Sequence, residues 1–199
     1  EYTNRQIAIF DSCVDELRKE GINPGIVHAA NSAAIIGSPA AWYDMVRPGI
    51  IAYGYYPSHD QDRIFEFRPV MEYRSKIVLL KSVEAGTPIS YGLTYRTNKK
   101  TTIATIPVGY ADGYRVAFSN RAKVLIKGRL FPVVGRVCMD NMMVDLGPDP
   151  KASLYDDVVL FGPDDGTPTA EDLADIASTI PYEIICGVSQ RVPRVYPPQ

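Results

Sequence analysis

The chain has 199 residues, 46% of them hydrophobic and 22% charged, which fits one large or two modest soluble globular domains. Its formal net charge of −2, with lysines and arginines spread along the chain, gives no reason to expect a nucleic-acid partner. The three cysteines, Cys13, Cys138 and Cys186, are too few and too far apart for a disulfide framework or a zinc site. No apolar run approaches the length needed to cross a bilayer, so we expect a cytoplasmic location for this chain. A membrane anchor elsewhere in a longer protein is compatible with that expectation.

The first 54 residues alternate helical and buried-strand patterns. Residues 3–21 predict a helix, because apolar side chains recur there at helical spacing: Ile7, Phe10, Val14 and Leu17. The short apolar run 25–30 predicts a buried strand, residues 33–37 a short helix, and residues 44–54 a second buried strand. This rhythm is typical of a parallel α/β unit.

A polar segment, residues 55–68, predicts a linker, and the pattern after it becomes β-rich. The expected strands are 70–83, 101–108, 122–126, 130–138, 142–146, 157–161 and a last one at 191–196, with one helix capped at Thr169 and a further segment at 182–188. Many short strands with Gly and Pro turns and little helix indicate an antiparallel barrel or sandwich. We therefore expect a small α/β part, residues 1–62, joined to a β-rich domain, residues 63–199.

Two loops of the α/β part have the chemistry of a phosphate site. Asn31-Ser32 begins the short helix, where free backbone N–H groups, a positive dipole end and a hydroxyl suit a phosphate. Arg47 offers a permanently charged donor, and Gly49 lets backbone amides approach a ligand closely. The alternative reading of Asn31-Ser32 is a plain helix N-cap.

Two tyrosines beside glycines mark the β-rich part. Residues 89–95 contain Tyr91 next to Gly92, and residues 106–113 contain Tyr110 after a glycine. A phenol at a strand-to-loop boundary can donate a hydrogen bond or transfer a proton. Each tyrosine can equally be read as an anchor at a sheet edge.

The loop 135–141 can meet a small charged substrate through Arg136, Met139 and Asp140. Cys138 is a poor nucleophile candidate, because no histidine follows it in the chain. The acidic pairs 156–157 and 164–165 lie in turn-like contexts and are read as solvated loop acids, so no metal site is expected.

Taken together, these segments resemble the bacterial alanine racemase family nearly end to end. The matching segments are, in order, His28–Ser32, Val46–Ile50, Tyr53-Gly54, Ile89–Gly92, Thr94-Tyr95, Ile106–Gly113, Gly135–Asp140 and Arg191–Arg194. The resemblance implies an α/β plus mainly β fold, in which the last units of a (β/α)₈ barrel precede an antiparallel, β-barrel-like C-terminal domain. It also implies a pyridoxal 5'-phosphate enzyme that interconverts L- and D-alanine, supplies D-alanine for peptidoglycan and forms a head-to-tail homodimer.

The resemblance assigns roles residue by residue. At the cofactor, Ser32, Gly49 and Ile50 would hold the phosphate, and Arg47 would face the pyridine nitrogen, with His28 also at the cofactor. Tyr91 would be the catalytic acid/base in the partner subunit's active site.

The resemblance also assigns the substrate site. Tyr110 would line the path of the substrate, the Met139 amide would bind the substrate carboxylate, and Asp140 would support that loop. Arg136 and Gln190 would complete the site.

The chemistry of racemisation agrees with these roles. The α-proton leaves from one face and returns on the other, so two bases are needed, which in the family are a lysine and a tyrosine. An ordinary tyrosine has a pKa of about 10, so a tyrosine base needs nearby donors or cations, which the family supplies through a His–Arg chain that includes Arg47. Arg47 also keeps its proton, so it donates to the pyridine nitrogen without protonating it, which should limit side reactions.

Two features depart from the family pattern. None of the eight lysines follows a buried strand in the setting of the family's Schiff-base lysine, so we expect the C-terminal half of a racemase, inactive without its N-terminal barrel half. Gln190 stands where alanine racemases commonly have tyrosine, which predicts a roomier, more polar pocket that tolerates serine. An alanine/serine racemase related to those of vancomycin resistance is therefore an alternative.

Two further alternatives come from other classes of protein. One is a decarboxylase of related barrel-plus-β architecture, and the other is a non-catalytic β-domain used for binding or dimerisation. The loop 138–140 and the segment 90–92 favour the racemase over both.

Overall fold

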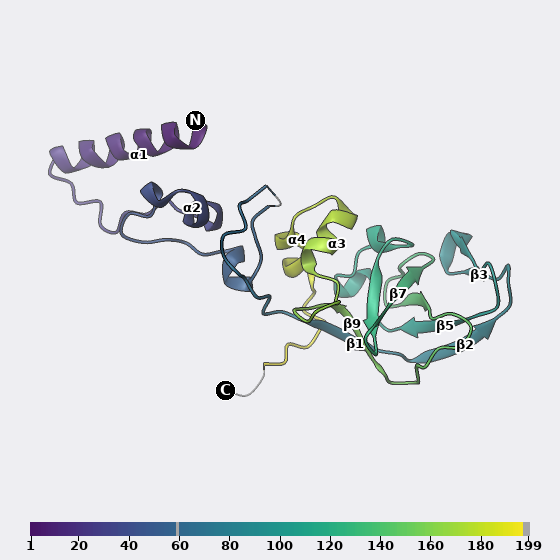
Figure 1. Ribbon diagram of the computed structural model, residues 1–199. Helices are drawn as coiled ribbons and strands as arrows, with labels where there is room; N and C mark the ends of the chain where they lie inside the picture. Colours follow the sequence, from purple (N-terminus) through teal and green to yellow (C-terminus); the bar gives the residue numbers. More distant parts are fainter. Residues whose placement is uncertain (59, 197–199) are drawn as a thin grey trace. The chain divides into compact units, whose positions relative to one another are not determined.

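The computed structural model describes residues 1–58 and 60–196 and divides into two compact units, Glu1–Arg68 and Pro69–Gln199. Figure 1 shows helices in the first unit and a curled sheet in the second. No helix in the described ranges is both long and apolar enough to traverse a bilayer.

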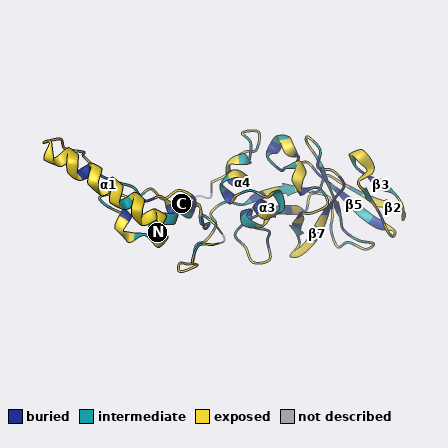
Figure 2. Ribbon diagram, turned by 90° about the horizontal axis from the view of Figure 1, so that it is seen from above, coloured by how far each residue is buried: buried dark blue, intermediate teal, exposed yellow. Residues whose placement is uncertain are grey.

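The first unit contains the two predicted helices. They are α1 (Tyr2–Lys19) and α2 (Ser32–Gly37), followed by the 3-10 helices η1 (Pro39–Ala41) and η2 (Ile50–Tyr53). Val14 is the only residue of α1 that is buried, and Figure 2 shows this helix exposed along most of its length.

The two strands predicted in this unit, 25–30 and 44–54, are not formed. Both segments are extended in part, but their described backbone-to-backbone hydrogen bonds to each other are isolated, from Asp44 N to Val27 O (3.0 Å) and from Arg47 N to Ala30 O (2.9 Å). Parallel strands are stable when other strands flank them and helices cover both faces of the sheet. The described residues of this unit supply no such sheet. The second segment instead turns into η2 after Gly49.

The predicted linker is tied to the first unit. No residue described in 55–68 is helical or β-sheet. The Tyr56 hydroxyl donates to the Phe65 carbonyl (2.6 Å) and accepts from the Phe65 amide (2.9 Å), so one side chain closes this loop.

The second unit is built on a seven-stranded antiparallel sheet. Its strands are β1 (Tyr73–Lys76), β2 (Leu79–Val83), β5 (Thr101–Ile106), β6 (Lys123–Ile126), β7 (Arg129–Val134), β8 (Met142–Asp145) and β9 (Asp157–Phe161), in the spatial order β1-β9-β6-β7-β8-β5-β2. The strands predicted at 101–108, 122–126, 130–138, 142–146 and 157–161 correspond to β5 to β9.

The sheet curls strongly because its two edge strands are neighbours in the chain. Only Ile77 and Val78 separate β1 from β2, and they divide the single strand predicted at 70–83. Ile77 N donates to Asp156 O (3.1 Å) beside β9, and Val78 N donates to Thr105 O (3.0 Å) on β5. One extended segment thus pairs first with one edge of the sheet and then with the other.

Helices α3 (Ala170–Ala177) and α4 (Pro181–Gly187) follow the sheet. The predicted cap, Thr169, accepts a hydrogen bond from Asp172 N (3.1 Å) in a capping box. Residues 182–188 lie mostly in α4, which begins at Pro181, a residue well suited to the first helical position.

The strand predicted at 191–196 is wrong. Arg194 donates to the carbonyls of Ser189 (3.1 Å), Val192 (2.7 Å) and Val188 (2.8 Å), so its guanidinium folds this segment back on itself. Pro193 also removes a donor that a strand would need.

A small β-hairpin stands on the sheet. Its strands, β3 (Pro88–Ile89) and β4 (Tyr95–Arg96), form a separate two-stranded sheet. Ile89 is buried with Ile103 and Val134, and Tyr95 packs against this cluster. The hairpin is therefore anchored by apolar contacts at its base, and the residues of its tip are not needed for that packing.

Candidate active site

Tyr91 lies at the tip of the β3–β4 hairpin, in a short 3-10 turn, and is 73% exposed. The residues around it have positive φ angles: Ser90 (63°), Gly92 (73°) and Leu93 (50°). Non-glycine residues avoid this region unless the surrounding structure fixes them, and such positions cluster at functional sites. The tip therefore holds its phenol outward at a conformational cost.

The loop that contains Arg136 fixes the tip from one side. Ser90 Oγ donates to the Arg136 carbonyl (2.6 Å) and lies 3.4 Å from Cys138 Sγ. A Cβ on Gly135 would lie 2.7 Å from the Ile89 carbonyl oxygen, so only glycine permits this close approach. The Arg136 guanidinium lies beside Gly92, at 3.6 Å from where a Cβ would stand.

The loop that contains Met139 is bound to the turn that contains Tyr110. Tyr110 N donates to Cys138 O (2.9 Å), and Ala111 N donates to Met139 O (3.0 Å). A Cβ on Gly109 would lie 2.2 Å from Cys138 O, so the two backbones are in direct contact. The Met139 amide itself has no hydrogen-bond partner within the described part of the chain, so it can donate to a ligand.

Arg191 joins these two loops through their carboxylates. Its guanidinium lies 2.7 Å from Asp140 Oδ1 and 3.3 Å from Asp112 Oδ1, and the hydrogen bond to Asp140 is the largest cause of its raised pKa. Asp112 is buried and accepts from the Gly109 amide (3.0 Å). Gln190 directly precedes Arg191, the residue that anchors the Met139 loop.

In the first unit, Ser32 and Gly49 bring two helix starts together. Gly49 N donates to Ser32 Oγ (2.9 Å), which joins the first residue of α2 to the cap of η2. The amides of Ser32 and Ile50 have no partner among the residues that the structure describes. Two free N–H groups at adjoining helix starts can donate to an anion.

Arg47 and His28 form a pair in the same unit. Arg47 Nη1 lies 2.5 Å from His28 Nδ1 and 3.4 Å from the His28 carbonyl, and Nη2 donates to the Ala29 carbonyl (3.2 Å). Because arginine only donates, His28 Nδ1 must be the acceptor and the ring must carry its proton on Nε2 when neutral.

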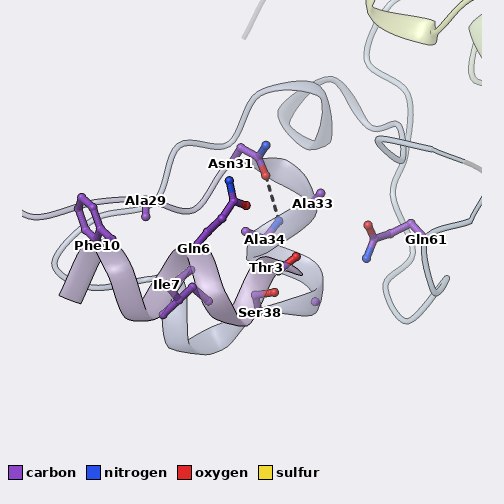
Figure 3. A pocket seen from close by; sticks show the side chains of 12 residues that line it. Thr3, Gln6, Ile7, Phe10, Ala29, Asn31, Ala33, Ala34, Ser38 and Gln61 are labelled. Atoms are coloured by element: carbon purple, nitrogen blue, oxygen red, sulfur yellow. Dashed lines mark hydrogen bonds between the residues drawn. The ribbon is translucent and has the colours of Figure 1, made fainter. Parts of the chain in front are cut away.

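A groove of about 650 Å³ also lies in this unit, between α1 and the segment that leads into α2 (Figure 3). It is lined by Thr3, Gln6, Ile7, Phe10, Ala29, Asn31, Ala33, Ala34, Gly37, Ser38, Ala41 and Gln61. Asn31 Oδ1 is occupied as the cap of α2, accepting from Ala34 N (3.1 Å). None of the predicted site residues lines this groove.

Comparison with known proteins identifies the family of this chain. The family described as "Alanine racemase, C-terminal domain" matches residues 70–196, and "Alanine racemase, N-terminal domain" matches residues 1–57. The chain belongs to the alanine racemase family. An alanine racemase from Halothermothrix orenii is 50% identical over 197 residues, which are 98% of this chain and 52% of that relative.

Solved structures of alanine racemases show the same fold. The enzyme from Clostridium difficile 630, in complex with cycloserine, has a TM-score of 0.91 at 48% identity over 96% of this chain and 51% of that one. The enzyme from Bartonella henselae, with covalently bound pyridoxal phosphate, has a TM-score of 0.84 at 30% identity over 98% of this chain and 52% of that one. The expected fold class is thus confirmed, and the chain spans about half the length of these relatives.

The sequence segments that resemble alanine racemases fall into two groups in the structure. Those of the first unit gather around the Arg47–His28 and Ser32–Gly49 contacts, and those of the second around the Tyr91 tip and the Met139 loop. Sequence reasoning missed the residues that hold these loops in place, such as Asp112 and Asn120. Asp112 pairs with Arg191, and Asn120 bonds to Thr94 and to the Gly135 amide, so their partners are distant in the sequence and leave no local pattern.

Proposed function

We propose that this chain is the C-terminal part of a pyridoxal-phosphate-dependent alanine racemase, an isomerase that interconverts L- and D-alanine by two-base proton transfer and supplies D-alanine for peptidoglycan. Residues 1–62 would complete the cofactor-binding barrel and residues 63–199 would form the C-terminal β-domain. The observation that carries the proposal is the exposed Tyr91 tip, held against the Arg136–Met139 loop in a chain that matches the family over both domains.

In this proposal, Tyr91 is the acid/base on one face of the substrate. Its phenol stands free of the sheet, and the strained tip fixes its direction before the substrate arrives. It acts in the active site of the partner subunit of a head-to-tail homodimer. The base on the other face is the lysine of the N-terminal barrel half.

The Met139 loop receives the substrate carboxylate. The free Met139 amide donates to it, Asp140 keeps the loop tied to Arg191, and the cationic Arg136 adds charge complementarity. Tyr110, 45% exposed and bound through its amide to the same loop, lines the path of the substrate.

The first unit has residues that fit pyridoxal 5'-phosphate. When bound, this cofactor makes the α-proton of an amino acid acidic by accepting electrons into its ring. Ser32 is only 2% exposed, so its hydroxyl mainly ties α2 to Gly49, while the free amides of Ser32 and Ile50 hold the phosphate. Support for this cofactor comes also from the Bartonella henselae relative, which carries it.

Arg47 and His28 set the charge at the pyridine nitrogen. His28 accepts from Arg47 and so fixes the direction of the guanidinium, which keeps its own proton and donates. A donor that does not give up its proton leaves the ring neutral, which favours racemisation over competing reactions.

The substrate is a small amino acid, alanine, and Gln190 raises the question of serine. The described structure shows the Gln190 side chain exposed. An amide that can donate and accept would be compatible with a hydroxyl on the substrate, where tyrosine would add bulk. We also place the activity in the cytoplasm, where the three free cysteines stay reduced.

The test is to complete the enzyme. The chain is joined to the first half of the Halothermothrix orenii relative, and racemisation of L-alanine and L-serine is measured with and without pyridoxal phosphate. We expect cofactor-dependent racemisation of alanine by the joined protein and none by the 199 residues alone. A joined protein that folds and binds the cofactor but leaves alanine unchanged would overturn the proposal.

Gln190→Tyr tests the serine alternative in the same protein. If Gln190 admits serine, the substitution lowers the ratio of kcat/KM for serine to that for alanine by about tenfold, the usual effect of a small change in a pocket. A ratio that does not move excludes Gln190 as the determinant.

A further inference from the structure

The turn at Ser119-Asn120 lies next to both the Tyr91 tip and the loop that leads to Met139. It follows the 3-10 helix η5 (Val116–Phe118). Asn120 Oδ1 accepts from Gly135 N (2.6 Å), and Asn120 Nδ2 donates to Thr94 Oγ1 (3.1 Å). One amide side chain therefore bridges the far end of the tip and the start of the Arg136 loop.

The orientation of this amide follows from its neighbours. The Gly135 N–H can only donate, so the oxygen of the Asn120 amide must face it. The NH₂ group must then face Thr94, whose hydroxyl can accept. Asn120 itself has a φ of 58°, a conformation that asparagine tolerates better than most residues.

The other residue of the turn, Ser119, also accepts a hydrogen bond from a backbone amide. Ser119 Oγ accepts from Val137 N (2.9 Å) and donates to Val116 O (2.5 Å). Past the end of β7 at Val134, two backbone amides thus find side-chain acceptors in place of a strand partner. The turn holds residues 135–137 where the sheet no longer does.

The tip needs such support. Its flanking strands, β3 and β4, are two residues long, and Ser90 and Leu93 each occupy a positive-φ conformation that non-glycine residues avoid. Ser90 holds the near end of the tip through the Arg136 carbonyl, and Asn120 holds the far end through Thr94. Both ties end on the same short segment, Gly135-Arg136, which continues into the Met139 loop.

We propose that Asn120 is a positioning residue for Tyr91, which sets the direction of the phenol relative to the substrate carboxylate site. The proposal rests on the racemase function proposed above. Asn120 touches neither substrate nor cofactor in this account; it acts through Thr94 and Gly135.

Three variants of the completed enzyme distinguish the effect of the Asn120 side-chain hydrogen bonds from that of its backbone conformation. Asn120→Gly removes both hydrogen bonds and still accepts a positive φ. Asn120→Asp keeps the acceptor for Gly135, and the Thr94 hydroxyl can turn to donate to the carboxylate, so it is the conservative rescue. Asn98→Gly, in the exposed loop between β4 and β5, is the matched control for a surface Asn-to-Gly change.

We expect Asn120→Gly to lower kcat about tenfold or more with KM for alanine within about twofold, since a misplaced acid/base costs rate rather than binding. Asn120→Asp should recover most of the rate, and Asn98→Gly should match the wild type. With α-deuterated alanine, the isotope effect on kcat should rise in the direction in which the tyrosine removes the deuteron and fall in the other. A merely structural loss would not move the two directions oppositely.

Hydrogen exchange gives a readout that does not depend on activity. Peptides covering residues 88–96 and 129–137 should exchange faster in Asn120→Gly than in the wild type. Unchanged exchange, or a kcat within twofold of wild type with unmoved isotope effects, would overturn the positioning role alone. A wild-type enzyme without racemase activity would instead overturn the proposed function and this role with it.

Discussion

Tyr95 shows how a single residue couples the sheet to the tip that contains Tyr91. Its hydroxyl donates to Asp145 Oδ2 (2.9 Å) on β8, and its ring packs on the cluster beneath the hairpin. Burial, followed by the hydrogen bond to Asp145, raises the pKa of Tyr95 to about 12. The folded protein therefore holds this proton more tightly than the unfolded chain.

This difference predicts a pH dependence of stability. Below pH 10 the tyrosine is protonated in both states and its contribution is complete; between pH 10 and about 12 the unfolded chain loses the proton first, so the free energy of unfolding falls. We expect Tyr95→Phe to flatten part of this decline. The measurement is urea unfolding at several pH values, with Tyr155→Phe, at an exposed tyrosine, as the control. Equal slopes for wild type and Tyr95→Phe would contradict the assignment.

At the scale of residues, the sequence predicts those site residues whose type is uncommon at a predicted loop. Tyr91 and Arg47 are notable by residue type and by the nearby Gly92 and Gly49, and Met139 by its place in a loop that resembles the family; their roles stay predictions. Asn120 and Asp112 have no such distinction, because ordinary turns use the same residue types. Only the three-dimensional pairing shows what they hold.

At the scale of elements, the turn of Tyr110 and the loop of Met139 behave as one piece. Gly109 lies against the Cys138 and Met139 carbonyls, and Gly113 lies against the Gly187 carbonyl, where a Cβ would stand 2.2 Å from the oxygen. Backbone contacts of this kind leave little freedom for either loop to move alone.

Gly109→Ala tests this contact. A Cβ there would lie 2.2 Å and 2.3 Å from two carbonyl oxygens, so the loops must separate, and we expect the free energy of unfolding to fall by about 1–3 kcal/mol. Gly187→Ala is the matched control, since its Cβ would meet only an arginine nitrogen at 3.9 Å. Urea denaturation of both variants checks the difference. Similar stabilities would mean that the loops are not in contact as described.

The elements themselves were predictable where the pattern is local. Strands β5 to β9 and helices α1 and α3 follow from alternation, helical spacing and capping residues. The strand predicted at 191–196 failed because Arg194 donates to the carbonyls of Val188, Ser189 and Val192. Those at 25–30 and 44–54 failed because a parallel strand depends on neighbouring strands from elsewhere in the chain.

At the scale of the whole molecule, the chain covers about half of each relative that it matches. Its two units are the matches to the two family domains, and each contains one group of predicted site residues. In the proposed function, the second unit supplies one base, Tyr91, and the carboxylate site, and the lysine comes from the N-terminal barrel half.

The most direct test of this account is Tyr91→Phe in the completed enzyme. Phenylalanine keeps the ring and removes the proton-transferring hydroxyl, so we expect kcat/KM for alanine to fall by roughly 10² to 10⁴, the usual contribution of a positioned acid or base. Tyr155→Phe should leave the rate unchanged. A loss of less than tenfold in Tyr91→Phe would contradict the role of Tyr91 on which the proposed mechanism depends.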